Sequence, residues 1–84
     1  MYGFKSTGKF SKQKDKLPQE ISKRAAEAMK SILTNPYSNG IRLVGNLKGF
    51  WKKRIGNYRI IYEIIESDKI VVFHIVEHRK NVYD

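Results

Sequence analysis

The sequence contains no cysteine and no long apolar run. The missing cysteine excludes a disulfide framework and a thiolate zinc site. A membrane-spanning helix needs roughly 18–20 apolar residues, and no segment approaches that length. The N-terminal residues MYGFKSTGKFSK lack the apolar region of a secretory signal. We therefore expect a soluble protein of the cytoplasm.

Histidine is scarce, with His74 and His78 as the two examples. Two histidines four residues apart fall short of a convincing metal site, so we expect neither a metal nor another cofactor. With 84 residues, the chain is expected to form a single domain over residues 1–84. A domain of this size has a modest hydrophobic core.

Acidic residues are few, with eight Asp and Glu against seventeen Lys and Arg. The resulting net charge of +9 attracts polyanions and speeds their encounter with the protein. Nucleic acid and an acidic protein partner would both satisfy such a field. The charge alone does not separate these two classes of partner.

The first half of the chain predicts a short edge strand over residues 1–6 and then two helices. A polar helix over Phe10–Leu17 stops at Pro18, which disfavours helix at the residue before it. The second helix carries an apolar stripe at helical spacing, and the Asn35-Pro36 pair ends it. The stripe consists of Ile21, Ala25, Ala28, Met29, Ile32 and Leu33.

The second half predicts strands, because the apolar period changes from helical spacing to two. The expected strands are Phe50–Ile55, Tyr58–Ile65 and Lys69–Glu77, after a short strand at Ile41–Val44. Gly56-Asn57 is a two-residue loop with glycine first, which suits a type II′ turn. The predicted fold class is α+β, with an N-terminal helical hairpin packed on a mainly antiparallel sheet.

The two-residue loop fixes how its strands pair. Arg54 then faces Arg59, and Lys52 faces Ile61. Side chains alternate across a sheet, so these three cations share the face turned away from the helices. Like charges placed opposite each other destabilise a sheet by about 0.2–1 kcal/mol. Either the arginines fan out into solvent, or the three cations form a site for an anion such as phosphate.

The third strand is expected to extend this cationic face. If Ile65 pairs with Ile70, then Val72, His74 and Val76 lie on it, with His78 following at the strand end. Glu63 would be its single carboxylate, and it would either pair with a neighbouring cation or act as a base.

The C-terminal residues add further groups to this face. Arg79 and Lys80 supply cations, and Tyr83 supplies an aromatic ring. Cations interleaved with an exposed aromatic suit RNA, because bases stack on rings while cations hold phosphates.

Several motifs together resemble the RelE/ParE superfamily of toxins from type II toxin–antitoxin systems, and RelE-type members most. The stretch "LVGNLKGFWKKRIGNYRIIYEI" contains an L-x-G segment, a basic strand and a Gly-x-Tyr-Arg hairpin followed by Ile-Tyr. The stretch "VVFHIVEHRKNVY" closes with His-Arg and a nearby tyrosine. The segment "KFSKQKDKLPQEISKRAAEAMKSILTNP" resembles the helical hairpin of the family. The resemblance covers nearly the whole chain.

The resemblance implies a ribosome-dependent endoribonuclease that cleaves mRNA in the ribosomal A site without a metal. A ribose 2′-OH attacks the adjacent phosphate and a 5′-OH leaves. By matching motif positions, Arg59 and Arg79 would hold the scissile phosphate and the leaving group. Lys52 and Arg54 would stabilise charge and lower the pKa of nearby groups. Tyr83 would stack on a base or assist deprotonation, and His78 could take one of the acid–base roles.

The resemblance also implies partners, namely the ribosome, mRNA and an acidic or amphipathic antitoxin of the RelB type. Phe50, Ile61 and Ile65 are candidates for antitoxin contacts on the otherwise cationic face. Two alternatives stay open. One is a ParE-like inhibitor of DNA gyrase on the same fold, and the other is an inactive toxin that binds RNA without cleaving it.

Overall fold

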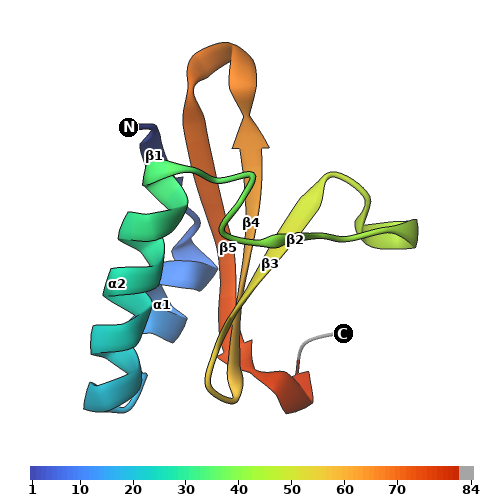
Figure 1. Cartoon of the computed structure of the whole chain (residues 1–84). Coiled ribbons are helices and arrows are strands. Elements are labelled where there is room, and N and C mark those ends of the chain that lie inside the picture. Colours follow the sequence, from blue (N-terminus) through green and yellow to red (C-terminus); the bar gives the residue numbers. More distant parts are fainter. Residues whose placement is uncertain (82–84) are drawn as a thin grey trace.

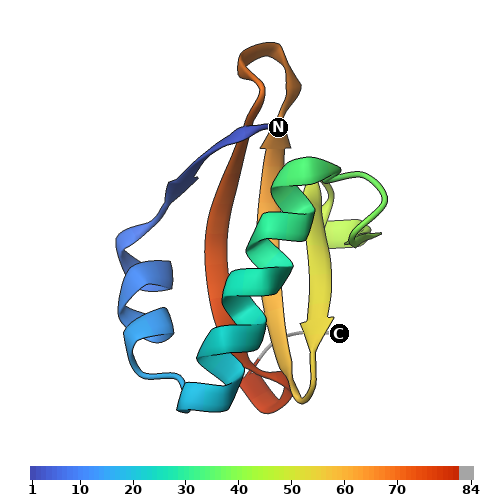
Figure 2. The ribbon, with the colours of Figure 1, turned by 60° about the vertical axis from the view of Figure 1, so that its left-hand side comes forward.

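A computed structural model describes residues 1–81 of the chain as two helices packed on one side of a five-stranded sheet (Figures 1 and 2). The sheet order is β1-β5-β4-β3-β2, with β1 parallel to β5 and every other pair antiparallel. This arrangement confirms the predicted α+β class and the mainly antiparallel sheet. The strands are β1 (Gly3–Ser6), β2 (Ile41–Arg42), β3 (Phe50–Ile55), β4 (Tyr58–Ile65) and β5 (Ile70–His78). The helices are α1 (Gly8–Asp15) and α2 (Gln19–Thr34), and three short 3-10 turns are η1 (Gly45–Leu47), η2 (Glu66–Asp68) and η3 (Arg79–Asn81).

The two helices lie close to their predicted positions. Helix α1 begins at Gly8 instead of Phe10, because Thr7 caps it: the Phe10 backbone N–H donates to the Thr7 hydroxyl at 3.1 Å. Helix α2 ends at Thr34, directly before the Asn35-Pro36 pair that predicted its end. Neither helix of the described chain is long and apolar enough to cross a membrane.

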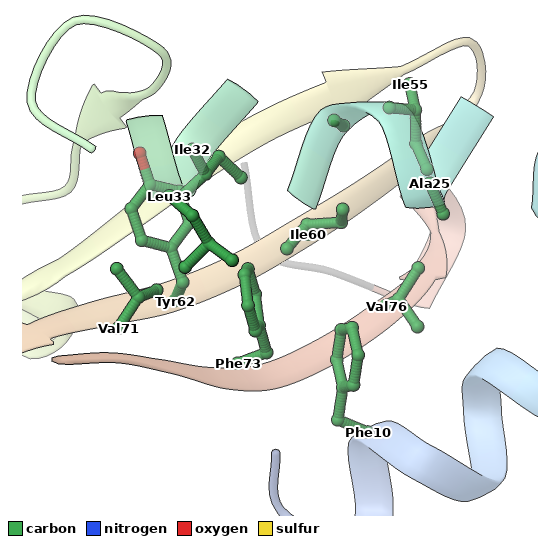
Figure 3. Packing of buried hydrophobic residues seen from close by; sticks show 11 residues of the cluster. Phe10, Ala25, Ile32, Leu33, Ile55, Ile60, Tyr62, Val71, Phe73 and Val76 are labelled. Atoms are coloured by element: carbon green, nitrogen blue, oxygen red, sulfur yellow. The ribbon is translucent and has the colours of Figure 1, made fainter. Parts of the chain in front are cut away.

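The core lies between the helices and the sheet (Figure 3). Ile32 on α2 and Tyr62 on β4 are both fully buried in it, and Phe10 of α1 stacks on Phe73 of β5 with ring centroids 5.4 Å apart. The buried Tyr62 hydroxyl finds a hydrogen-bond partner by donating to the Pro36 carbonyl at 2.7 Å. The apolar stripe of α2 therefore packs as its spacing predicted.

The β3–β4 hairpin has the predicted register throughout. Arg54 pairs with Arg59 and Lys52 with Ile61. Gly56 has φ +63°, a left-handed conformation that the first loop position of a type II′ turn requires. The opposition of the two arginines is thus built into the fold.

The pairing of β5 differs from the prediction in its second half. Ile65 pairs with Ile70 as expected, but the register shifts by one residue between Ile61 and Tyr62, because β5 carries a β-bulge at His74. Beyond the bulge the side chains of β5 change faces. Val76, expected on the cationic face, is instead buried in the core, with 1% of its surface exposed.

The bulge also moves the two residues after Val76. Glu77 pairs with Arg59 on the side away from the helices, so the expectation that Glu63 would be the single carboxylate there is wrong. His78 pairs with Tyr58 on the helix side, not on the cationic face as predicted. A single extra residue therefore places a carboxylate where the sequence suggested none.

Candidate functional site

The face of the sheet turned away from the helices is called the open face here. Paired residues line up across the strands in rows. The first row holds Arg54, Arg59 and Glu77; the second holds Lys52, Ile61 and Ile75; the third holds Phe50, Glu63 and Val72. Charged side chains thus lie mainly at the end of the face near the β3–β4 turn, and apolar side chains lie mainly in its middle. The charged end, with Arg54, Arg59 and Lys52, is called the cationic end below.

Arg59 is held firmly at the centre of the first row. Its side chain is 4% exposed, and its Nη1 donates to the carbonyls of Gly56 at 3.3 Å and Tyr58 at 3.0 Å. Its opposite residue, Arg54, is exposed to solvent. One guanidinium is therefore fixed against the hairpin, and its neighbour is accessible to a ligand.

Lys52 lies in the second row, next to this pair. The residue is 8% exposed, far less than most lysines. It lines a hollow of about 280 Å³ together with Arg54 and the loop residues Ser38 and Asn39. A lysine ammonium and an arginine fork beside polar loop groups suit an anion such as phosphate.

Arg79 is brought to the same end of the molecule by the turn η3. Its backbone N–H donates to the Asn57 carbonyl at 2.7 Å, which ties the start of η3 to the β3–β4 turn. Figure 1 shows η3 leaving β5 on the side away from the helices. Arg79 itself is exposed. The fold therefore places Lys52, Arg54 and Arg59 on one hairpin and ties the backbone of Arg79 to its turn, and a role of these cations in binding an anion stays a prediction.

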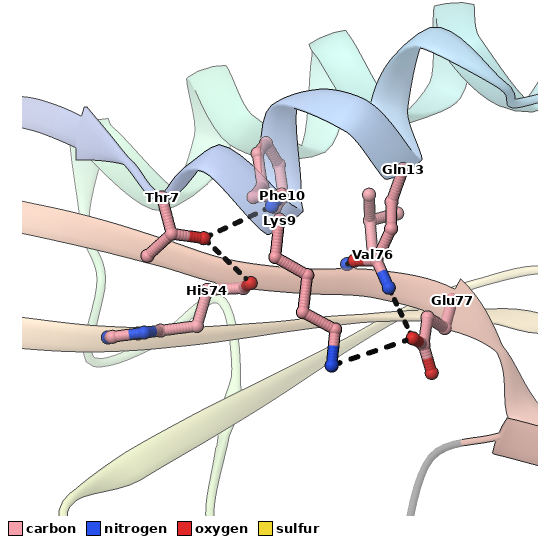
Figure 4. Close-up of polar contacts among 7 residues, drawn as sticks. All are labelled: Thr7, Lys9, Phe10, Gln13, His74, Val76 and Glu77. Carbon is pink, nitrogen blue, oxygen red and sulfur yellow. Dashed lines mark hydrogen bonds and ion pairs between the residues drawn. The ribbon is translucent and has the colours of Figure 1, made fainter.

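Glu77 is the site residue that sequence reasoning missed (Figure 4). Gln13 of α1 donates a hydrogen bond to its carboxylate, and the Lys9 ammonium lies 4.0 Å from the same oxygen. The side-chain Oε1 of Gln13 also accepts a hydrogen bond from the Val76 backbone N–H at 3.0 Å. Helix α1 thus pins Glu77 beside Arg59 and brings Lys9 to the open face.

His74, at the bulge, interacts with the apolar part of the open face. Its Nε2 lies 3.1 Å from the Glu63 carboxylate, and its ring meets the Phe50 ring edge-on at 5.2 Å. The partner of Glu63 is therefore this histidine. His74 is half-buried, with 29% of its side chain exposed.

Two predicted site residues remain, His78 and Tyr83, and the structure describes the first of them. His78 lies on the helix side, where its ring meets Tyr58 at 5.3 Å and its Nδ1 accepts from the Lys80 backbone N–H at 3.2 Å. It is separated by the sheet from the opposed arginines. Tyr83 lies outside the described residues.

Two large pKa shifts occur at the opposite end of the sheet, around Glu66. Its carboxylate accepts hydrogen bonds from the Lys69 ammonium, from the Tyr37 hydroxyl at 2.6 Å and from the Tyr2 hydroxyl at 2.7 Å. These donors lower the pKa of Glu66 to about 2, and the shared carboxylate raises the pKa of Tyr37 to about 12. Burial raises the pKa of Tyr62 to about 12. The Glu66 cluster ties the N-terminus and the loop after α2 to the β4–β5 turn, which is a structural role.

Residues 1–81 contain no group of three or more histidine or carboxylate side chains that could hold a metal ion. The donors of the cationic end are ammonium and guanidinium groups, which repel a cation and attract phosphate.

Solved structures with this fold come from toxin–antitoxin systems. A chain of the toxin–antitoxin complex RelBE2 from Mycobacterium tuberculosis is 30% identical, with a TM-score of 0.84, 95% of this chain and 93% of that chain covered. The isolated E. coli RelE toxin is 19% identical, with a TM-score of 0.84 and coverage of 93% and 84%. The YoeB/ParE toxin from Agrobacterium tumefaciens is 12% identical, with a TM-score of 0.81 and coverage of 90% and 96%. These likenesses define a RelE-like toxin fold.

The family follows from the sequence. Residues 4–83 match the family described as ParE toxin of type II toxin-antitoxin system, parDE. The chain belongs to this family and is a type II toxin of the RelE/ParE superfamily. No curated protein is significantly similar to it in sequence.

Proposed function

We propose that this toxin is a ribosome-dependent endoribonuclease that cleaves mRNA in the ribosomal A site. The observation that carries the proposal is the opposition of Arg54 and Arg59, with Lys52 in the next row. A sheet that served stability alone would not place two arginines directly opposite each other. A bound phosphate would turn this repulsion into attraction.

The arrangement suits attack of a ribose 2′-OH on the neighbouring phosphate. The reaction forms the O2′–P bond and breaks the P–O5′ bond, and it passes through a crowded, highly charged phosphorane. The 2′-OH loses its proton to a base, and an acid gives a proton to the leaving O5′. Preorganised cations stabilise such a state most, because they need no reorganisation when charge develops. Arg59 fits this role, since two backbone carbonyls hold its guanidinium in place.

The other cations take complementary roles in the proposal. Arg54 is exposed and would reach a phosphate oxygen, and Arg79 would contact the leaving-group side. Lys52 would stabilise charge from the second row. Tyr83 stays a predicted stacking or proton-transfer residue. His78 faces the helix side, so an acid–base role for it would require the C-terminal segment to rearrange around Tyr58.

The proposal includes a cytoplasmic location and an acidic or amphipathic antitoxin. The net charge of +9 favours such a partner, and similar chains are seen in toxin–antitoxin complexes. Phe50 and Ile65 are partly exposed on the open face, whereas Ile61 is only 4% exposed. An antitoxin that packs on Ile65 and reaches Phe50 would shield the cations from RNA. A folded Ile65→Asp variant should then bind the antitoxin more weakly; unchanged binding would contradict this contact.

The second candidate is a DNA gyrase inhibitor. The description of the matching family as ParE toxins and the likeness to a YoeB/ParE toxin favour it. The cluster of four cations around one hairpin favours the ribonuclease, because gyrase inhibition needs no face that cuts phosphodiesters. The third candidate function is that of a toxin that binds RNA without cleaving it.

Product chemistry separates these functions. Purified toxin is incubated with a labelled mRNA on programmed ribosomes and, separately, with gyrase and supercoiled plasmid. A ribonuclease gives RNA fragments with 5′-OH ends and leaves the plasmid untouched. DNA breaks with intact mRNA would establish the gyrase inhibitor instead. If both the mRNA and the plasmid stay intact, RNA binding without cleavage is the remaining candidate function.

A further inference from the structure

A hollow of about 310 Å³ lies on the open face beside the cationic end. Its lining includes Lys9, Leu47, Phe50, Ile61, His74 and Ile75. The floor is apolar, built from β4, β5 and the start of β3, and Leu47 of η1 forms one wall. Helix α1 closes the opposite side with Lys9. This hollow is called the apolar hollow below.

The apolar hollow adjoins the cations in a fixed geometry. Ile61 in its floor pairs with Lys52 and is two residues from Arg59 on the same face of β4. Two residues along a strand span about 6.6–6.8 Å, which is of the order of one nucleotide. A phosphate held at the arginines would therefore place a neighbouring base over the apolar hollow.

Polar groups at the edge of the apolar hollow can contact a base and its backbone. The imidazole of His74 lies against the Phe50 ring and pairs with Glu63 at 3.1 Å. That imidazole and carboxylate can donate to and accept from a base edge. The Lys9 ammonium, 63% exposed and 4.0 Å from Glu77, can reach a second phosphate.

We propose that the apolar hollow binds the base of a nucleotide next to the scissile phosphate. The inference rests on the proposed function and adds a specificity subsite to it. Aromatic and aliphatic side chains beside a cationic track are typical of single-stranded RNA sites, where a base stacks while cations hold the backbone. An apolar side chain of the antitoxin is the competing occupant. The cations on two sides, Lys52 and Lys9, favour a phosphate-bearing ligand.

Direct binding is tested by NMR with the four nucleoside 5′-monophosphates as probes. The signals followed are the methyl groups of Ile61 and Ile75 in the apolar hollow, with Ile21 and Ile32 on the helix side as internal controls. We expect nucleotides, but not inorganic phosphate, to shift the methyl signals of Ile61 and Ile75 and to leave those of Ile21 and Ile32 unchanged. Equal shifts with inorganic phosphate, or no shift at millimolar nucleotide, would overturn the proposal.

A filling variant sharpens this test. Leu47→Trp should occupy the apolar hollow and weaken nucleotide binding by about tenfold or more, because base stacking contributes that much. Val44→Trp is the matched control, since Val44 lies at the same loop but is 81% exposed and does not line the hollow. Both variants are first shown to be folded by thermal unfolding. Equal nucleotide affinity in the two variants would overturn the proposal.

Cleavage then shows whether the subsite sets specificity. On programmed ribosomes with mRNAs that differ at one base near the cut, we expect Leu47→Trp to change the preference among bases while Val44→Trp keeps it. An unchanged preference would contradict the inference. If neither the wild type nor the two variants cleave RNA but nucleotides still bind as expected, the proposed ribonuclease function is wrong and the proposed base site is supported. If Leu47→Trp loses only antitoxin affinity, the competing occupant is correct.

Discussion

Arg59 on β4 and Glu77 on β5 lie directly opposite each other on the open face of the sheet. Arg59 thus has an arginine opposite it on one neighbouring strand and a carboxylate opposite it on the other. Glu77 is held there by Gln13, and the Lys9 ammonium lies 4.0 Å from the same carboxylate oxygen. The carboxylate therefore offsets part of the local positive charge and lowers the repulsion between the two arginines.

Replacing Glu77 by glutamine should strengthen RNA binding. Glu77→Gln keeps an oxygen that can accept from Gln13 but removes a negative charge beside Arg59. One unit charge at about 4 Å in water contributes roughly 1 kcal/mol, so an RNA oligonucleotide should bind up to about fivefold more tightly at low salt. The gain should vanish near 1 M salt, where the screening length falls to about 3 Å. Fluorescence anisotropy over a salt series measures both effects, and weaker binding at low salt would show that Glu77 itself contacts RNA.

Helix α1 should stabilise the second half of β5, which lies beyond the end of β1. There, the Thr7 hydroxyl donates to the His74 carbonyl at 3.0 Å, and Gln13 accepts from the Val76 N–H. Gln13→Ala leaves a buried backbone donor without this acceptor, which should cost about 1–3 kcal/mol of unfolding free energy. Lys12→Ala, an exposed neighbour on the same helix, should change it by less than about 0.5 kcal/mol. Urea unfolding of both variants measures the difference, and equal stabilities would contradict the role of Gln13.

Local patterns predicted the β3–β4 hairpin well and the end of β5 poorly. In the hairpin, a two-residue loop with glycine first leaves a single register for the flanking strands, so the opposed arginines could be read from the sequence. In β5 the residues Ile75 and Val76 are both apolar and β-branched. Either could face the core, so the alternation did not reveal the bulge at His74.

Tertiary packing decides the register at that point. Val76 fills the core between the sheet and the helices, and Gln13 captures its backbone N–H. Such contacts join residues more than sixty positions apart, which no local pattern encodes. The same limit explains why the positions of Glu77 and Lys9 beside Arg59 could not be predicted, whereas the arrangement of Lys52, Arg54 and Arg59 within one hairpin could.

Gly40 should tolerate no side chain. A Cβ at this position would lie 2.0 Å from the Tyr62 hydroxyl oxygen and 3.1 Å from the Lys52 carbonyl oxygen. Tyr62 is fully buried and cannot move aside, so Gly40→Ala should cost about 1–3 kcal/mol or more. Gly8→Ala is the control, because its Cβ would meet nothing within 4 Å at the start of α1. That variant should be neutral or more stable by about 0.4–1 kcal/mol. Thermal unfolding that ranks the two variants in the reverse order would contradict the packing described.

Acid should weaken the Glu66 cluster in a defined pH window. The pKa of Glu66 falls from an ordinary 4.5 to about 2 in the folded protein, so the folded state binds its proton less tightly than the unfolded state. Its stabilising contribution is therefore complete above about pH 4.5 and is lost as pH falls toward 2. The difference in unfolding free energy between the wild type and Glu66→Gln should stay constant from pH 7 to 5 and then shrink. Because the cluster is exposed, we expect a modest effect. A difference that persists at pH 2 would contradict the role of the carboxylate charge.

Cleavage of a defined mRNA on programmed ribosomes tests the central claim most directly. The proteins compared are the wild type, Arg59→Ala, Arg54→Ala and the control Lys23→Ala, which removes an exposed cation from α2. Each is first shown to be folded, because Arg59 is nearly buried. We expect the wild type and Lys23→Ala to cut in the A site, leaving 5′-OH ends. Each arginine variant should cut about 10²–10³-fold more slowly, the usual cost of losing one stabilising donor. Folded wild-type protein that leaves the mRNA intact, or arginine variants that cut at the wild-type rate, would contradict a ribonuclease built on the opposed arginines.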